Sequence, residues 1–390
     1  MNTNNIQEKF NLMFGKAPSL YRSPGRINII GEHTDYNEGF VLPAAIDKAV
    51  YVAISKRDDQ QVHLHATKYD ETFQFDLSDI KPTEKQWPNY ILGVVAEIQK
   101  KNLKIGGFNL MFEGDIPGGA GLSSSAAIEC SVAFALNDQF SLGIDKMTLV
   151  HIAQKAEHNF AGVMCGIMDQ FASVFGKKDH AIMLDCKTLE YKYVPINLPG
   201  YTFVLFNTNV KHNLASSAYN DRRASCFKGV EWVKEHHPEV NSLRDVTIAM
   251  LDEHVKAKDQ DVYVKCKFIV EEIERLQLAC IDLEVNDLVS LGKRMLETHE
   301  GLSKAYEVSC EELDYLVDQV KDNPNVLGAR MMGGGFGGCT INLVKEEAVE
   351  ELTATLTKSY TEKFDLELTS YIVKIENGSE TVKLPELQSS

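Results

Sequence analysis

Residues 112–140, FEGDIPGGAGLSSSAAIECSVAFALNDQF, are the stretch around which this chain is organised. The glycine-rich segment 118–121 leads into three serines and then into a run of small residues with helical composition. Glycines let backbone N–H groups approach a ligand closely, and the N-terminus of a helix carries unpaired donors and a partial positive charge. The stretch therefore predicts a phosphate-binding loop, although an ordinary helix with a glycine-rich lead-in has the same composition.

The size and charge of the chain restrict what it can be. At 390 residues it is longer than one hydrophobic core usually serves, so we expect two domains. Its 40 basic and 56 acidic residues give a net charge of −16, which argues against nucleic acid and anionic membranes as partners. The eight cysteines form no CxxC pair, and the sequence contains neither a signal-peptide pattern nor a long apolar run. We therefore expect a cytoplasmic protein with reduced thiols.

A second polar stretch, GEHTDYNEG at residues 31–39, separates the apolar runs INII and FVL. It presents the carboxylates of Glu32 and Asp35 on one tip between two strand-like segments. Carboxylate oxygens accept pairs of hydroxyl hydrogen bonds, which is a common way to bind sugars. An exposed hairpin tip whose charges face water is the alternative. Arg26 weighs against it, because a lone cation entering an apolar strand needs a buried anion nearby.

One carboxylate stands in apolar surroundings further along the chain. Between Gly162 and Gly176 the only charged residue is Asp169, among valine, isoleucine, methionine and phenylalanine. We expect this segment to be buried, and leaving a carboxylate unpaired there would cost several kcal/mol. Asp169 must therefore be paired with a cation or take part in chemistry.

A second glycine-rich stretch, GARMMGGGFGGCTINLV at residues 328–344, formally fits the dinucleotide fingerprint GxGxxG. That fingerprint needs a strand before it and a helix after it, whereas residues 339–344 have the pattern of a strand. We therefore reject NAD binding. The pattern GxxxxGK[ST] is also absent, so the common nucleoside-triphosphate loop is unsupported. A tight glycine hairpin that packs against the phosphate loop is the better interpretation.

Three stretches, residues 25–43, 114–127 and 328–344, resemble in order and spacing the three motifs of the GHMP small-molecule kinases. The resemblance also covers AEHNFAGVMCGIMDQFAS at 156–173 and VKHNLASSAYNDRR at 210–223. The GEHTDY core is similar to the signature of the branch of that family that phosphorylates galactose.

The resemblance implies a fold, an activity and partners. The expected fold is an α/β (α+β) two-domain kinase with its active site in the cleft between an N-terminal domain, residues 1–195, and a C-terminal domain, residues 196–390. The expected reaction is the transfer of phosphate from ATP to the C1 hydroxyl of D-galactose, with Mg²⁺ as cofactor. The expected partners are D-galactose and MgATP, with no nucleic acid and no membrane, and we expect a monomer.

The resemblance also assigns residues to each part of the site. Asp169 would lie at the anomeric hydroxyl with Arg26 beside it, and would either take the hydroxyl proton or orient the hydroxyl. Ser124 and Glu157 would lie near Mg²⁺. The positions that would bind the sugar are Glu32, His33, Asp35, Gly166, Asp169 and Tyr219. The positions that would bind ATP are Trp87, Tyr90, Gly118, Gly119, Ala120, Gly121, Leu122, Ser123, Ser124 and Ser125.

Alternatives to this activity remain open at the level of sequence. A related sugar 1-kinase acting on N-acetylgalactosamine or arabinose would use the same carboxylate tip, with the room at C2 as the discriminator. A galactose sensor that binds sugar and ATP without catalysis would lack part of the serine–alanine run, which is complete here at residues 123–127. One departure from the family pattern is Met332, where a threonine is usual; it loses a hydroxyl but keeps the backbone donors.

Overall fold

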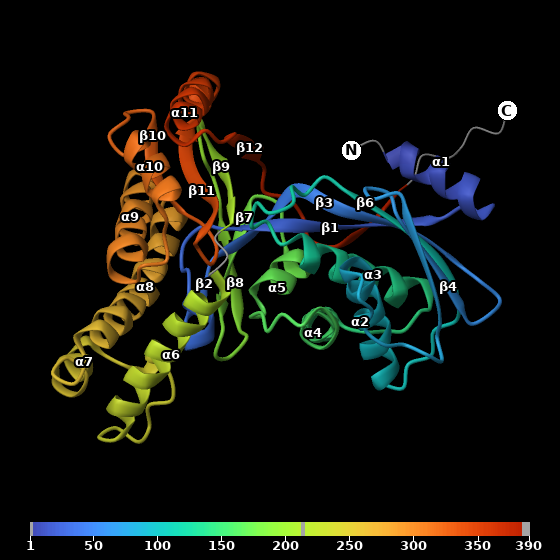
Figure 1. Ribbon diagram of the computed structural model, residues 1–390, viewed down its shortest axis with the longest axis horizontal. Coiled ribbons are helices and arrows are strands. Elements are labelled where there is room, and N and C mark those ends of the chain that lie inside the picture. Colours follow the sequence, from blue (N-terminus) through green and yellow to red (C-terminus); the bar gives the residue numbers. More distant parts are fainter. Residues whose placement is uncertain (1–2, 212–214, 384–390) are drawn as a thin grey trace.

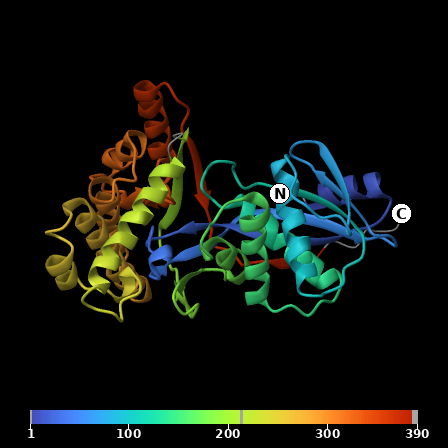
Figure 2. The same ribbon diagram turned by 60° about the horizontal axis from the view of Figure 1, so that its bottom comes forward.

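The structure, a computed structural model, describes residues 3–211 and 215–383 and has two halves (Figure 1). Figures 1 and 2 both show helix α1 (Thr3–Phe14) at one end of the molecule and the helices of residues 215–320 at the other. Residues 212–214, part of the family-like stretch 210–223, lie outside the described residues. The mixed α/β fold predicted from the sequence is confirmed.

The N-terminal half is built on a six-stranded sheet with the order β13-β1-β3-β6-β4-β5. Strands β4 and β6 are parallel, and the other neighbours are antiparallel. The strands are β1 (Ser19–Asn28), β3 (Pro43–Lys56), β4 (Gln61–Ala66), β5 (Glu71–Asp76), β6 (Phe108–Gly114) and β13 (Glu380–Val382). Val52 and Ile54 belong to the large core beneath the helices, whereas Ala53 between them packs toward α1, as the two-residue period of a strand requires.

Helices cover both faces of this sheet. Helix α1 packs on one face through Ile6 and Phe10. Four helices lie on the other face, as Figure 1 shows: α2 (Gln86–Lys100), α3 (Ser124–Gln139), α4 (Lys146–Ala156) and α5 (Met168–Phe175). A one-turn π-helix, Glu157–Ala161, continues α4. Helix α3 is the helix that follows the glycine-rich loop, so its N-terminus opens toward the middle of the molecule.

The C-terminal half contains a four-stranded antiparallel sheet with the order β10-β11-β9-β12. Its strands are β9 (Tyr201–Lys211), β10 (Val326–Met331), β11 (Gly337–Lys345) and β12 (Thr369–Val373). Its helices are α6 (Ala215–Lys234), α7 (Ile248–His254), α8 (Gln260–Glu284), α9 (Leu288–Glu300), α10 (Glu311–Val320) and α11 (Val349–Phe364). Strand β11 confirms the strand predicted over residues 339–344, and it forms a hairpin with β10 around the glycine run.

Acidic N-caps set where several of these helices begin. The Asp259 carboxylate accepts hydrogen bonds from the backbone of Asp261 and Val262 at the start of α8, and Asp287 caps α9 in the same way. Such caps satisfy N–H groups that have no partner within the helix. Helix α3 is different, because its N-cap Ser123 has a left-handed backbone and makes no side-chain cap bond. The first N–H groups of α3 therefore remain available to a ligand.

The two halves are linked by more than one passage of the chain. A three-stranded sheet, β2 (Phe40–Val41), β7 (His180–Asp185) and β8 (Tyr191–Pro195), lies between them (Figure 1). After β12 the chain returns to the N-terminal half, where Ile375 bridges to Ile46 and β13 pairs with β1. The domain division after residue 195 stays a prediction. The segment that includes Ile375 and β13 belongs in sequence to the C-terminal domain predicted for residues 196–390, but it packs on the N-terminal half.

Candidate active site

The polar tip at residues 31–39 is buried, so the alternative of a hairpin tip facing water is wrong. Glu32, His33 and Thr34 are 4%, 5% and 0% exposed. The β10–β11 hairpin and α8 cover the tip: the Gly333 amide donates to Glu32 Oε1 at 2.9 Å, and the Gly31 amide donates to Glu272 of α8 at 3.0 Å. Two carboxylates are thereby removed from bulk water, which strengthens every polar contact they make.

Arg330 is the cation that compensates Glu32. Its side chain is 0% exposed, and its guanidinium donates to the backbone carbonyls of Asn28 and Ile29 and, at 3.1 Å, to Glu32 Oε1. Arg330 was not predicted from the sequence. The signal was present, because Arg330 is a lone cation in an apolar strand, which is the same argument that singled out Arg26.

The glycine hairpin was predicted to pack against the phosphate loop. Among the described residues the hydrogen bonds from its glycine run to the N-terminal half lead to the polar tip, from Gly333 to Glu32 and between Gly334 and His33. Met332 is 3% exposed and packs in the main core, while its amide donates to Cys339. The methionine therefore contributes apolar packing where a threonine is usual, and its backbone bond is kept.

Asp35 lies beside a glycine that leaves it room. A Cβ added at Gly166 would stand 2.4 Å from Asp35 Oδ2, so only glycine allows this carboxylate its position. Burial raises the pKa of Asp35 to about 6. The pKa is raised because removing the carboxylate from water penalises its charged form.

Asp169 is paired, as its apolar surroundings predicted. Arg26 Nε and Nη2 each approach Asp169 Oδ1 at 2.9 Å, and the Ser123 hydroxyl donates to Oδ2. Arg26 also donates to the carbonyl of Gly121 in the glycine-rich loop. One arginine thus joins the acid to the loop. The expected burial of segment 162–176 is only partly right, because Val163 and Met164 are 48% and 70% exposed and the Asp169 side chain is 27% exposed.

The approach of β1 to the glycine-rich loop is close. The Arg26 amide donates to the Leu122 carbonyl at 3.3 Å, and a Cβ at Gly25 would stand 2.6 Å from the same oxygen. Ser123, at the end of the loop, has φ of 60°. A left-handed non-glycine residue costs of order 1–3 kcal/mol and is typical of functional sites. Here the conformation directs the Ser123 hydroxyl to Asp169.

Glu157 lies next to the third serine of the loop. Ser125 Oγ donates to Glu157 Oε1 at 2.9 Å, and Gln170 Nε2 donates to Oε2 at 2.7 Å. Gln170 also reaches the fully buried Glu129 at 3.4 Å. Burial raises the pKa of Glu157, and burial followed by repulsion from Glu157 raises that of Glu129 well above its usual range. This concentration of buried acid fits a divalent cation at Glu157.

Two cavities flank the loop. One, of about 540 Å³, is lined by the predicted sugar positions Glu32, His33, Asp35, Gly166, Asp169 and Tyr219, together with Arg26. The other, of about 420 Å³, is lined by Trp87, Tyr90, Gly118, Ser124 and Ser125. Ser123, which bonds Asp169, immediately precedes the serines of the second cavity. The structure therefore brings the predicted sugar residues to one side of the serines and the predicted adenine residues to the other.

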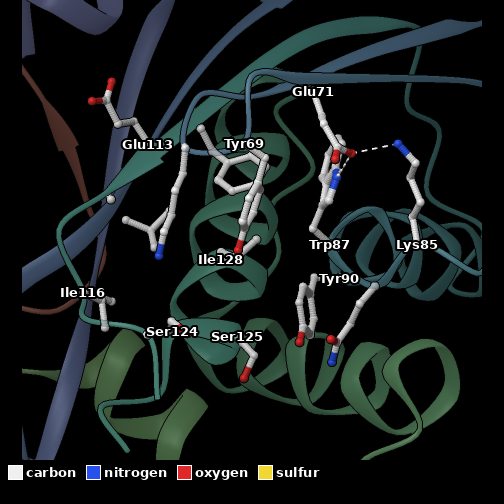
Figure 3. A pocket seen from close by; sticks show the side chains of 16 residues that line it. Tyr69, Glu71, Lys85, Trp87, Tyr90, Glu113, Ile116, Ser124, Ser125 and Ile128 are labelled. Atoms are coloured by element: carbon white, nitrogen blue, oxygen red, sulfur yellow. Dashed lines mark hydrogen bonds and ion pairs between the residues drawn. The ribbon is translucent and has the colours of Figure 1, made fainter. Parts of the chain in front are cut away.

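Aromatic side chains line the second cavity, as Figure 3 shows. Tyr69, Trp87 and Tyr90 surround the space above Ser124 and Ser125. The indole N–H of Trp87 donates to the Glu71 carboxylate at 3.1 Å. Lys85 donates to the same carboxylate at 2.7 Å, so the ring is held in one orientation. Stacking on a purine is a usual role for such rings.

Two residues of this cavity, Lys68 and Tyr69, were not predicted from the sequence. They lie in the turn between β4 and β5, and the Lys68 ammonium would be 3.6 Å from a Cβ at Gly118. Among the described residues Lys68 forms no ion pair, although the chain is strongly acidic. A single lysine in a turn carries no signal in the sequence, because only the sheet brings it to the loop.

Comparisons with known families match this geometry. A model of the GHMP kinases N terminal domain matches residues 89–177, and one of the GHMP kinases C terminal region matches residues 273–362. Mevalonate kinase from Methanococcus jannaschii shares the fold alone, with a TM-score of 0.64 at 19% identity over 93% of this chain and 99% of that chain. The fold and the paired cavities define a small-molecule kinase of the GHMP class, for which ATP is the co-substrate.

More specific matches identify the branch. A model of the galactokinase galactose-binding signature matches residues 8–56. Galactokinases from Clostridium acetobutylicum and Thermotoga petrophila are 42% and 41% identical to this chain over 97% and 93% of it, and over 99% of each relative. The crystal structure of Lactococcus lactis galactokinase complexed with galactose has a TM-score of 0.92 at 34% identity, covering 98% of this chain and 100% of that one. The chain belongs to the galactokinase family.

All eight cysteines, each within the described residues, are free thiols. No helix within residues 3–211 and 215–383 is long and apolar enough to cross a membrane. In the same part of the chain no group of three or more His, Cys, Asp or Glu side chains could hold a metal ion alone.

Replacing Arg330 by methionine should destabilise the protein severely, because Glu32 would remain buried without its cation. Breaking one partner of a buried ion pair costs about 3–5 kcal/mol. Urea unfolding of Arg330→Met measures this loss, and adding Glu32→Gln should recover part of it. Lys81→Met removes an exposed lysine from its pair with the exposed Asp79 and should change little. Equal effects of the two replacements would contradict the role given to Arg330.

Proposed function

We propose that the protein transfers the γ-phosphoryl group of MgATP to the C1 hydroxyl of D-galactose, giving galactose 1-phosphate and ADP. The observation that carries this proposal is the bond between Asp169 and Ser123, which joins the carboxylate-lined cavity to the glycine-rich loop. A sugar hydroxyl at Asp169 and a phosphate at the loop would then be neighbours. Family membership and the galactokinase relatives support the same reaction.

The sugar would be bound through carboxylates and one tyrosine. Glu32 uses Oε1 for Arg330 and Gly333, which leaves Oε2 to accept from a sugar hydroxyl. Asp35 contributes a second carboxylate where Gly166 leaves space. Tyr219 closes the cavity from α6. A neutral polyol suits this lining, because ionised carboxylates can only accept hydrogen bonds and hydroxyls can donate them.

Asp169 and Arg26 would carry the chemistry. The C1 hydroxyl donates to Asp169, its proton moves to that carboxylate, and its oxygen forms a bond to the γ-phosphorus as the bond from that phosphorus to the β-phosphate oxygen breaks. Phosphoryl transfer depends chiefly on positioning and on neutralising charge. Arg26 serves both, because it orients Asp169 and places a positive charge between the acid and the loop.

Mg²⁺ would be held by Glu157 and by a serine of the loop. The family resemblance favours Ser124 for this role; Ser125, whose hydroxyl bonds Glu157, is the better candidate from the contacts. Mg²⁺ commonly uses one or two protein ligands and completes its shell with water and substrate phosphates, so one carboxylate and one hydroxyl suffice. When bound, the ion neutralises charge on the ATP phosphates. Gln170 fixes the orientation of Glu157 from behind.

ATP would bind along the second cavity and the loop. The adenine would stack among Trp87, Tyr90 and Tyr69, and the phosphates would meet the backbone of residues 118–125 and the N-terminus of α3. Lys68, which forms no ion pair among the described residues and lies close to Gly118, would contact the phosphates directly. In a chain of net charge −16 these local donors are needed to hold an anionic nucleotide.

Turnover on a panel of sugars tests the reaction. ADP release with MgATP is expected on galactose and not on glucose or without sugar, and Asp169→Asn should lower kcat at least about a hundredfold because the proton acceptor is lost. Preference for N-acetylgalactosamine or arabinose would replace the proposed substrate. Binding of sugar and ATP with no turnover on any sugar would favour the sensor.

Acid should weaken the use of galactose through Asp35. Its carboxylate must be ionised to accept hydrogen bonds from sugar hydroxyls, and burial raises the pKa of Asp35 in the ligand-free protein to about 6. We therefore expect kcat/KM for galactose to fall about tenfold per pH unit below about 6, since this ratio reports groups of the free enzyme. The pH profile of Asp35→Asn, at its lower overall rate, should lack this limb.

The same variant gives a check on stability. Because the folded-state pKa of Asp35 is raised, its contribution to stability is present below the unfolded value and is lost as the pH rises through about 6. At pH 7.5, Asp35→Asn should therefore unfold at a higher temperature than the unsubstituted protein. A lower unfolding temperature would contradict the burial cost assigned to this carboxylate.

Removing the Lys68 ammonium should weaken nucleotide binding and leave sugar binding unchanged. Lys68→Met is expected to raise KM for ATP about tenfold and to leave KM for galactose unchanged, because a charge-assisted contact is worth about 1.5–3 kcal/mol. Initial rates at varied ATP and saturating galactose measure this. Lys81→Met, an exposed lysine paired with Asp79, is the matched control. An unchanged KM for ATP would remove Lys68 from the site.

A further inference from the structure

A chain of hydrogen bonds runs from the sugar cavity into the C-terminal core. His33 Nε2 lies 3.2 Å from the carbonyl of Gly334, and its Nδ1 lies 2.9 Å from the Tyr36 hydroxyl. The Tyr36 hydroxyl lies 2.7 Å from that of Tyr306, which in turn lies 3.2 Å from the Cys226 thiol. The chain therefore joins the polar tip, the glycine hairpin, the segment after α9 and helix α6.

The bond between His33 Nε2 and the Gly334 carbonyl determines the direction of every other bond in this hydrogen-bond chain. A carbonyl oxygen can only accept, so His33 Nε2 carries a proton. Burial lowers the pKa of His33 to about 4, so the ring is neutral at physiological pH and Nδ1 must accept from Tyr36. A phenol has a single proton, so Tyr36 in turn accepts from Tyr306, and Tyr306 accepts from Cys226. Burial also raises the pKa of both phenols, which keeps them protonated.

The surroundings of His33 hold it in this state. Glu32 on the same loop favours the charged ring, but Glu32 is itself paired with Arg330, and Arg222 of α6 opposes a positive charge. The rings of Tyr219 and Tyr306 pack at 5.3 and 5.1 Å from the imidazole. The glycine hairpin adds only backbone groups on its side. Both ring nitrogens are thus engaged within the protein, so His33 has no free ring nitrogen for a sugar hydroxyl.

We propose that Tyr36 and Tyr306 are positioning residues of the sugar site: their hydroxyls hold His33 as the Nε2–H tautomer, which ties the glycine hairpin to the polar tip. This inference rests on the proposed function for its kinetic consequences only. His33 becomes a positioning residue as well, in place of the sugar ligand that the family resemblance implies.

The bond between His33 and Gly334 matters because it fixes the positions of the sugar-binding groups around it. His33 has φ of 62°, a strained conformation for a residue with a side chain, and it separates Glu32 from the Asp35 segment. The bond from its Nε2 to Gly334 holds the hairpin, which supplies the Gly333 amide to Glu32. Tyr219 packs against the same imidazole. Loss of the tautomer would therefore displace sugar-binding groups and leave the nucleotide cavity unchanged.

Phenylalanine variants remove the hydroxyls and keep the rings. Tyr36→Phe is expected to raise KM for galactose about tenfold, because a buried acceptor loses its donor, with KM for ATP unchanged. Tyr306→Phe should have a smaller effect and Cys226→Ala the smallest, since each lies one bond further from His33. Tyr360→Phe is the matched control, because it removes another buried phenol hydroxyl, which donates to the Thr208 carbonyl, and neither residue lines the sugar cavity.

The tautomer can be read directly by NMR of ¹⁵N-histidine-labelled full-length protein without ligands. The His33 signal is identified by its absence in His33→Gln. We expect a neutral ring protonated at Nε2 in the unsubstituted protein and in Tyr360→Phe, and loss of that single tautomer in Tyr36→Phe. This spectrum does not depend on the substrate, so it tests the chain even if galactose is not turned over.

Other results would overturn the inference. A His33 ring protonated at Nδ1 in the unsubstituted protein would reverse the chain, and an unchanged tautomer and KM in Tyr36→Phe would remove its role. A purely structural role predicts instead that Tyr306→Phe has the larger effect, because Tyr306 is fully buried and Tyr36 is not. If Tyr36→Phe fails to fold, the spectra of the unsubstituted protein and of Tyr306→Phe decide the question.

Discussion

The buried ion pair between Glu32 and Arg330 is the interaction on which the rest of the site depends. Removing a carboxylate and a guanidinium from water costs several kcal/mol each, and their mutual attraction offsets this only when the remaining hydrogen bonds are also made. Here the backbone carbonyls of residues 28 and 29 and the amide of Gly333 complete the set. The polar tip can therefore be buried only when the C-terminal hairpin lies on it.

This constraint couples the two halves of the chain. The tip belongs to the N-terminal half and the hairpin to the C-terminal half, and the sugar cavity is lined from both. Asp169, the proposed proton acceptor, is bonded by Arg26 and Ser123, which both belong to the N-terminal half. Reacting groups are thus fixed to the loop that would carry the phosphates, while the groups that recognise the sugar depend on contact between the halves.

Backbone strain and buried charge occur together where the chemistry is proposed. His33 and Ser123 both have left-handed backbones, and their side chains bond Tyr36 and Asp169. The acids Asp35, Glu157 and Glu129 all have pKa values raised by burial. Perturbed carboxylates of this kind are typical of functional sites, because their cost in the free protein is recovered when hydroxyls or a cation bind.

The sequence alone determined the fold class and the pairing of Asp169, and it named part of the set of residues that lines each cavity, because these depend on local composition and on short motifs. Only the tertiary structure decided that the polar tip is buried, that the glycine run of the hairpin bonds to this tip, and that Lys68 reaches Gly118. It also decided that both nitrogens of His33 are engaged within the protein. Such facts depend on contacts between residues far apart in the chain, and a motif specifies which groups are present but not which partner each one finds.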